Sequence, residues 1–173
     1  MSENEGTMSL TRIYSIYIKA SPQAIWDAIT NPEWTSRYGY GGRAEYDLRP
    51  GGTFQGLVSE AMKRDAASRG MTLPDRAIDG EVLEADQPRR LILRWRMVMD
   101  KAMEAQGFTR LTYEINDSGQ GVTKLTLVHE FGTATRLAAL LNGEWENQGA
   151  GGGWPWVLSD LKTLLETGQS FQR

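Results

Sequence analysis

The sequence contains no cysteine and a single histidine, His129. Without cysteine the chain cannot form a disulfide, use a thiolate nucleophile or bind a metal through sulfur. One histidine also excludes a metal site built from several imidazoles, and no Ser–His–acid set accompanies it. We therefore expect no metal and no cofactor, and the composition favours a binding role over an enzymatic one.

Long apolar runs and clusters of basic residues are also missing. No hydrophobic stretch approaches the roughly 20 residues that span a bilayer. The first seven residues lack both the basic region and the apolar region of a secretory signal. Lys and Arg number 19 against 22 Asp and Glu, a net charge of −3, so nothing favours a nucleic-acid partner. We expect a cytoplasmic protein without membrane insertion or nucleic-acid binding.

A chain of 173 residues fits one domain, which at this size buries roughly 70% of the surface that the unfolded chain exposes. Residues 1–9 are polar and are expected to form a disordered tail. The single domain is expected to cover residues 10–168.

The segment from Trp154 to Gly168 has the spacing of an amphipathic helix. Pro155 suits the first turn and Gly168 a C-terminal stop. The apolar side of this helix is expected to hold Trp154, Val157, Leu158, Leu161, Leu164 and Leu165. Its polar side is expected to hold Asp160, Lys162, Thr163 and Glu166. Such an apolar stripe needs a partner surface.

Most of the preceding chain alternates with the period of two that is typical of strands. Strands are predicted over residues 13–20, 43–48, 53–58, 78–85, 91–99, 109–115 and 123–131. Short helices are predicted after Ser21-Pro22, over residues 33–38 and over residues 133–142, and residues 59–74 form either a loop or a helical insertion. A turn is predicted over residues 116–121 and a linker over residues 144–153. The class is α+β, with an antiparallel sheet wrapped around the last helix.

Five phrases occur in one order along residues 10–168: Ala20-Ser21-Pro22 to Glu33, Arg49-Pro50-Gly51-Gly52-Thr53-Phe54, Gly80-Glu81-Val82-Leu83-Glu84 to Leu91 with Trp95, Leu125-Thr126-Leu127-Val128-His129-Glu130, and Gly153-Trp154. Together they resemble the START-like (SRPBCC, Bet v 1-like) superfamily, and within it the branch similar to the C-terminal domain of the activator of Hsp90 ATPase. The resemblance implies a helix-grip fold, in which a curved sheet grips the C-terminal helix and leaves a cavity between them.

His129 is the foremost candidate for a functional residue. It alternates with Leu125 and Leu127, so it is expected to point towards the helix. There it could hydrogen-bond a ligand or transfer a proton. The alternative is a core histidine that a neighbouring hydroxyl or carbonyl satisfies. No catalytic residue is assigned.

Aromatic and methionine side chains could line the cavity, because small-molecule pockets are mainly apolar with a few polar groups. Trp95, Met97 and Tyr113 are favoured because they lie in mid-strand on the expected inner face. The predicted ligand-binding set is His129, Trp95, Met97, Tyr113, Phe54, Trp26 and Trp154. Plain core packing is the alternative for each of them.

The leading hypothesis is a small cytoplasmic protein that binds a hydrophobic or amphipathic molecule, such as a lipid, between sheet and helix. The resemblance adds two alternatives: a protein-interaction role of the Hsp90 co-chaperone type, connected with the stress response, and an enzyme of the polyketide cyclase or aromatase kind. A homodimer remains open.

Overall fold

A computed structural model of the protein describes residues 9–172. The predicted tail, residues 1–9, lies outside this range except for Ser9. The strands are β1 (Leu10–Ile18), β2 (Arg43–Tyr46), β3 (Thr53–Leu57), β4 (Arg76–Asp86), β5 (Arg90–Met97), β6 (Thr109–Gly119) and β7 (Val122–Gly132). The helices are α1 (Pro22–Thr30), α2 (Pro32–Thr35), α3 (Glu60–Ser68), α4 (Lys101–Glu104), α5 (Thr135–Leu141) and α6 (Gly153–Thr167), with a 3₁₀ turn, η1, at Glu146–Gln148.

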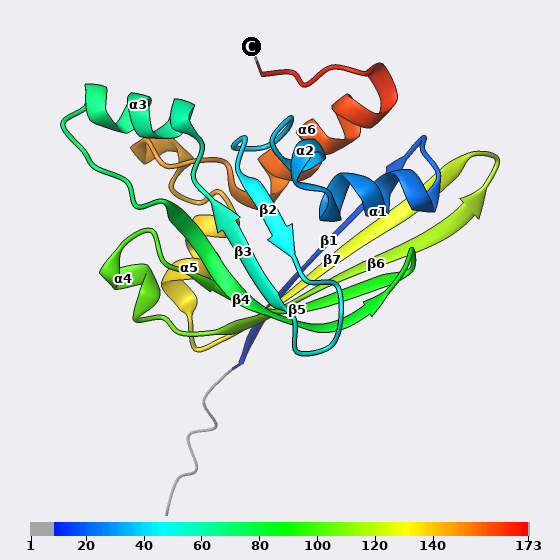
Figure 1. Ribbon diagram of the computed structural model, residues 1–173, viewed down its shortest axis with the longest axis horizontal. Coiled ribbons are helices and arrows are strands. Elements are labelled where there is room, and N and C mark those ends of the chain that lie inside the picture. The colour runs from blue at the N-terminus through cyan, green and yellow to red at the C-terminus, as the bar shows by residue number, and fades with distance from the viewer. Residues whose placement is uncertain (1–8, 173) are drawn as a thin grey trace, which may run out of the picture.

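The strands form one antiparallel sheet in the order β1-β7-β6-β5-β4-β3-β2. Every strand from β2 to β7 pairs with its sequence neighbour, and β1 crosses over to pair with β7, so β1 and β2 are the two edges. Figure 1 shows the sheet strongly curved, with α1, α2 and α6 on its concave side. This confirms the α+β class and the helix-grip fold.

The last helix begins and ends as its sequence predicts. Leu158, Leu161 and Leu164 are buried, and Gly168 ends α6 in the left-handed conformation at φ +82°. One expectation is wrong: Asp160, placed on the polar side, is fully buried. Its carboxylate is covered by the residues that follow the helix, and a periodicity argument that stops at Gly168 does not include them.

The first helix also follows its local signals. The Ser21 hydroxyl accepts a hydrogen bond from the Ala24 N–H at 3.1 Å, and Pro22 occupies the first turn. The apolar side of α1 is buried in the hydrophobic core through Ile25, Trp26, Ala28 and Ile29. Asn31 then closes α1 and caps α2, its side chain accepting from the Glu33 N–H at 2.9 Å.

Residues 59–74 resolve as a helical insertion rather than a loop. The Ser59 hydroxyl accepts from the Met62 N–H at 3.1 Å and starts α3. Only Ala66 of this helix is buried. Figure 1 shows α3 projecting beyond the end of the sheet that lies opposite α1.

Three segments predicted as a turn, a loop and a linker contain regular secondary structure. The arms of the β6–β7 hairpin run to Gly119 and from Val122, so most of the predicted turn at residues 116–121 is strand. The loop after β5 contains α4, which Asp100 caps by accepting from the Met103 N–H at 2.8 Å. The predicted linker at residues 144–153 contains η1. No helix within residues 9–172 is both long and apolar enough to span a membrane.

Candidate functional site

His129 lies on β7 with its side chain on the concave face, opposite Leu111 of β6 and Arg12 of β1. The residue is fully buried. Leu125, Leu127 and Phe131, at two-residue spacing on the same strand, are buried on the same side. The alternation of β7 therefore predicted the direction of His129 correctly.

Both ring nitrogens of His129 take part in hydrogen bonds. The Trp154 indole Nε1 lies 3.1 Å from Nδ1, and the Thr109 hydroxyl lies 2.7 Å from Nε2. The same hydroxyl lies 3.0 Å from the Trp95 carbonyl oxygen. Four residues from β5, β6, β7 and α6 are thereby linked in one chain of polar contacts.

The groups at the two ends of this series of hydrogen bonds decide which atoms donate and which accept. An indole N–H can only donate, so Nδ1 of His129 must accept and Nε2 must carry the proton. Nε2–H then donates to the Thr109 oxygen, which leaves the Thr109 proton to donate to the Trp95 carbonyl. Burial lowers the pKa of His129 to about 3, so the imidazole is neutral at ordinary pH. This geometry favours the interpretation of His129 as a satisfied core histidine.

Trp154 reaches His129 because the chain turns sharply as it enters α6. Gly153 has φ +69°, and a Cβ atom at this position would lie 2.1 Å from the Leu141 carbonyl oxygen. The Gly153 N–H also donates to the Tyr40 hydroxyl at 3.0 Å. Glycine is therefore required directly before Trp154, which explains physically why these two residues occur together.

The aromatic rings around His129 form a compact group. Trp95 lies edge-on to His129 with ring centroids 5.1 Å apart. The Phe131 ring stacks on the His129 ring with centroids 3.9 Å apart. Trp154 lies 6.5 Å from Trp95 and packs edge-on against Tyr113 at 6.4 Å. Four of the predicted site residues, His129, Trp95, Tyr113 and Trp154, are thus brought together beneath α6.

The other three predicted residues lie further along the same core. Phe54 of β3 stacks with Tyr46 of β2 at 4.7 Å, and Met97 of β5 pairs with Ile78 of β4. Trp26 is buried within α1. All three belong to the main hydrophobic core, and no aromatic contact joins them to the group around His129.

Tyr46 and Tyr113 are deep in the molecule and yet keep accessible surface. Burial raises the pKa of both phenols strongly, and for Tyr46 the nearby phenols of Tyr113 and Tyr38 add to the effect. Both residues are only partly buried by accessible area. Tyr113 lies in an inner strand between Leu91 and Leu127, which are fully buried, so its accessible surface faces the concave side of the sheet.

Sequence reasoning missed two features of this region. Thr109 shares the inner face with Leu111 and Tyr113, and its position diagonal to His129 follows from the β6–β7 register alone. Asp160 accepts hydrogen bonds from the Gly39 N–H, the Ser170 hydroxyl, the Phe171 N–H and the Gln172 amide. Burial opposes ionisation of Asp160, but these four donors outweigh it and lower its pKa.

Two hollows open on the surface away from His129. One, of about 580 Å³, lies along the C-terminal segment and is lined by Arg37, Leu164 and Gly168 to Gln172. The other, of about 420 Å³, is lined from β3, β4 and β5 together with Phe108. Among the described residues no group of three or more His, Asp or Glu side chains is arranged to hold a metal.

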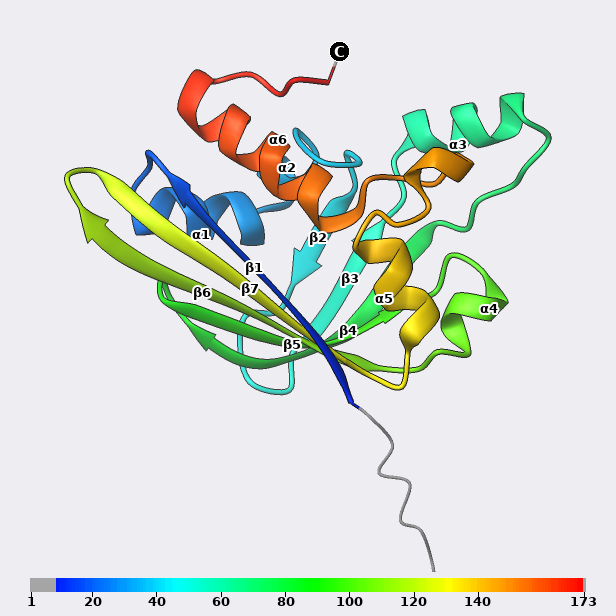
Figure 2. The same ribbon diagram turned by 180° about the vertical axis from the view of Figure 1, so that it is seen from behind.

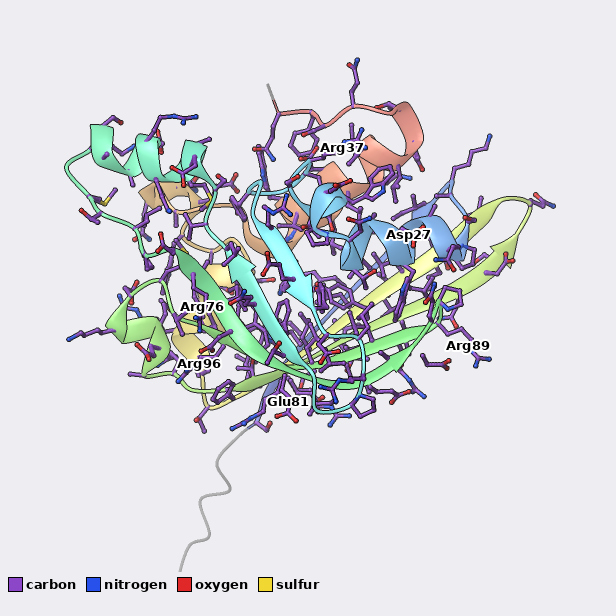
Figure 3. The ribbon with its side chains drawn as sticks, viewed as in Figure 1. Asp27, Arg37, Arg76, Glu81, Arg89 and Arg96 are labelled. Atoms are coloured by element: carbon purple, nitrogen blue, oxygen red, sulfur yellow. The ribbon has the colours of Figure 1, made fainter. Side chains whose placement is uncertain are left out.

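Figure 3 labels six charged residues: Asp27 on α1, Arg37 near α2 and α6, and Arg76, Glu81, Arg89 and Arg96 along the sheet. Figure 2 shows α6 crossing the concave side above β1 and β7. Aromatic and aliphatic residues of the hydrophobic core, from α6 and from the inner face of the sheet, make up most of the region between them.

A seven-stranded curved sheet gripping a C-terminal helix, with an aromatic group between them, defines a helix-grip protein. A family model described as Activator of Hsp90 ATPase homolog 1-like protein matches residues 19–166. The chain therefore belongs to this family, as its sequence phrases predicted. No curated protein matches the chain significantly.

Solved structures share this fold at low sequence identity. An HSP90 activator from Plasmodium falciparum is 18% identical over 90% of this chain and 96% of its own, with a TM-score of 0.61. The Aha1 dimer from Colwellia psychrerythraea is 17% identical over 93% and 99%, with a TM-score of 0.60. CalU16 from Micromonospora echinospora is 21% identical over 80% and 71%, with a TM-score of 0.56.

Proposed function

We propose that the protein binds a hydrophobic or amphipathic small molecule between α6 and the concave face of the sheet. The observation that carries the proposal is the accessible surface of Tyr113, an inner-strand residue on the concave side of the sheet whose ring packs edge-on against Trp154 of α6. Trp154 and Tyr46 are likewise only partly buried, so the region holds apolar surface that a ligand could cover. Each 100 Å² so covered contributes about 2.5 kcal/mol at ~25 cal/mol per Å².

The hydrogen bonds of His129 give this residue a positioning role in the proposal. Its two nitrogens hold Trp154 and Thr109 and leave no lone pair or proton for a bound molecule. His129 would fix the indole of Trp154 as one wall of the site. The acid–base role that a cyclase-type enzyme would require has no support from this geometry, so the proposal is for a binding protein.

Binding can be tested with a fluorescent hydrophobic probe, 1-N-phenylnaphthylamine, in a displacement and thermal-shift assay. A ligand at 100 times its Kd stabilises the folded state by about 2.7 kcal/mol, which in a chain of this length raises Tm by roughly 5–10 °C. Tyr113→Trp adds bulk at the accessible face and is expected to abolish probe binding. Tyr17→Trp is the matched control, because Tyr17 is 55% exposed on the outer side of β1. Unchanged binding in Tyr113→Trp would place the probe elsewhere.

A protein-interaction role is the second candidate, and a patch on the convex face favours it. The ring of Phe108 is 40% exposed and lies 3.9 Å from the guanidinium carbon of Arg94 and 4.5 Å from that of Arg96. Aromatic and arginine side chains are enriched where proteins bind one another. The likeness to an HSP90 activator suggests a chaperone as the partner.

This second candidate can be tested by measuring the ATPase rate of an Hsp90-type chaperone with and without the protein. Stimulation that Phe108→Ser removes and Tyr17→Ser leaves intact would support it, since both side chains are exposed on the convex side. An ATPase rate that does not respond to the wild-type protein would exclude the role.

Dimerisation is a further prediction. Ile13 on the edge strand β1 is 66% exposed, and a free edge strand is a template for pairing with another chain. One end of this edge is already occupied by α6, where the Lys162 ammonium donates to the Tyr17 carbonyl and Glu166 accepts from the Lys19 N–H. Light scattering at micromolar concentration, with Ile13→Lys as the disrupting variant, tests whether the remaining edge pairs.

A further inference from the structure

The hydroxyl groups of Tyr46 and Tyr113 are the starting point for identifying the kind of ligand. Within the described residues every inaccessible side-chain nitrogen or oxygen has a hydrogen-bond partner. No other described residue bonds to either of these two hydroxyls, so their oxygens must themselves lie on accessible surface. Tyr38, the third phenol of the group, differs because it donates to the Ala28 carbonyl at 2.9 Å.

Both hydroxyls belong to residues on the concave side, and the Tyr113 phenol is near enough to Tyr46 to contribute to its raised pKa. Tyr46 is held by its stacking on Phe54, and Tyr113 by its edge-on contact with Trp154. Burial keeps both phenols neutral because it raises their pKa strongly. Each therefore offers one O–H donor at every physiological pH.

The surrounding inner face carries almost no charge. The inward side chains of β5, β6 and β7 are Leu91, Leu93, Trp95, Met97, Thr109, Leu111, Tyr113, Ile115, Leu125, Leu127, His129 and Phe131. Those of β2, β3 and β4 include Ala44, Tyr46, Phe54, Ile78 and Val82. Arg12 on the edge strand β1 is the exception, and it lies near Tyr14. Moving a charged ligand into such a region without a counter-charge is costly.

We propose that the molecule bound between α6 and the sheet is uncharged and presents a carbonyl-type oxygen to the Tyr46 and Tyr113 hydroxyls. An apolar ligand without an acceptor would strip water from both O–H groups and leave them unsatisfied, which disfavours binding. A ligand with only donor groups would leave the same protons unpaired. This inference rests on the proposed function and narrows it to apolar ketones, quinones or similar compounds.

Three probes of one size test the proposal: 2-acetylnaphthalene, which has an acceptor; 2-ethylnaphthalene, which has none; and 2-naphthoate, which is charged. Their Kd values can be measured by competition against 1-N-phenylnaphthylamine. The ketone is expected to bind about 3- to 10-fold more tightly than the hydrocarbon for each hydrogen bond it gains. The anion is expected to bind most weakly.

Tyr113→Phe and Tyr46→Phe should each reduce the preference for the ketone, and the double variant should abolish it. The hydrocarbon should bind the double variant more tightly than the wild type, because it no longer strips water from the two O–H groups. Tyr17→Phe, an exposed tyrosine of β1, should change nothing. If either core variant fails to fold, the infrared carbonyl band of 2-acetylnaphthalene bound to the wild-type protein decides. A shift to lower wavenumber relative to hexane supports the hydrogen bond, and an unshifted band overturns it.

The outcomes separate this inference from the function on which it rests. Equal affinities for ketone and hydrocarbon would overturn the choice of ligand and leave binding itself intact. Tighter binding of 2-naphthoate would also overturn it and assign recognition to Arg12. If no probe binds, the proposed function itself fails.

Discussion

The carboxylate of Asp160 accepts a hydrogen bond of 2.9 Å from the backbone N–H of Gly39, 121 positions earlier in the chain. Gly39 follows α2 and has φ +64°, a conformation that suits glycine. The same carboxylate receives the Phe171 N–H at 2.9 Å. One buried acidic group therefore ties α6, the C-terminal segment and the loop before β2 together.

Replacing Asp160 is expected to be costly because it leaves a buried backbone donor, the Gly39 N–H, and a part-buried one, the Phe171 N–H, without an acceptor. Asp160→Ala removes the partner of the Gly39 and Phe171 N–H groups, and unsatisfied buried groups cost about 1–3 kcal/mol each. We expect a loss of about 3 kcal/mol in the free energy of unfolding, measured by urea denaturation. Asp27→Ala is the control, since Asp27 accepts only from the exposed Gln23 side chain. Similar losses in the two variants would contradict this role.

The comparison of sequence and structure shows which features local patterns can predict. The inner face of β7 and the ends of α6 follow from periodicity and from Gly168, because those signals lie within one element. The burial of Asp160 depends on Gly39 and on Ser170 to Gln172, which lie in other segments. No local pattern places these partners around it.

The core group around His129 was predictable only in part. The alternation of side chains along the strands predicted that His129, Tyr113 and Trp95 face the inner side of the sheet, and all three do. The bonds to Thr109 and Trp154 depend on strand register and on the rotation of α6, which Gly153 sets through its close approach to Leu141. Likewise, the polar composition of residues 116–119 predicted a turn, although these residues continue the β6–β7 ladder beyond the core.

The stability of the protein is expected to fall between pH 7.5 and 5 because of His129. Its folded-state pKa of about 3 lies below the unfolded value of about 6.5, so as pH falls the unfolded state binds a proton that the folded state does not. The expected loss is about 2 kcal/mol over this range. Urea titrations at several pH values measure it.

His129→Gln provides the control for this pH dependence. The chain has no other histidine, so the slope of stability against pH in this window should flatten in the variant whatever its absolute stability. A slope that persists in His129→Gln would assign the proton to another group.

The Trp154 indole is expected to matter through its N–H as well as its ring. Trp154→Phe keeps an aromatic side chain but leaves the buried Nδ1 of His129 without a donor. We expect a loss of about 1–3 kcal/mol, or roughly 2–12 °C in Tm. Trp156→Phe, two positions along α6, is the control. Trp156 is 36% exposed, and among the described residues the only aromatic ring that it contacts is that of Phe171. An equal loss in both variants would argue that ring volume alone is responsible.

Thr109 provides the sharpest test of the chain of hydrogen bonds. Thr109→Val keeps the shape of the side chain and removes the hydroxyl, which takes away the acceptor of the His129 Nε2–H and one donor to the Trp95 carbonyl. Thr109→Ser keeps the hydroxyl and loses one methyl group, worth about 0.8 kcal/mol. If the hydroxyl joins the two partners, Val should destabilise the protein by about 2 kcal/mol or more and Ser by about 1 kcal/mol. The ¹⁵N spectrum of the imidazole should show Nδ1 unprotonated in the wild type and in Thr109→Ser. Val and Ser variants of equal stability would mean that methyl packing, and not the hydroxyl, holds Thr109 in place.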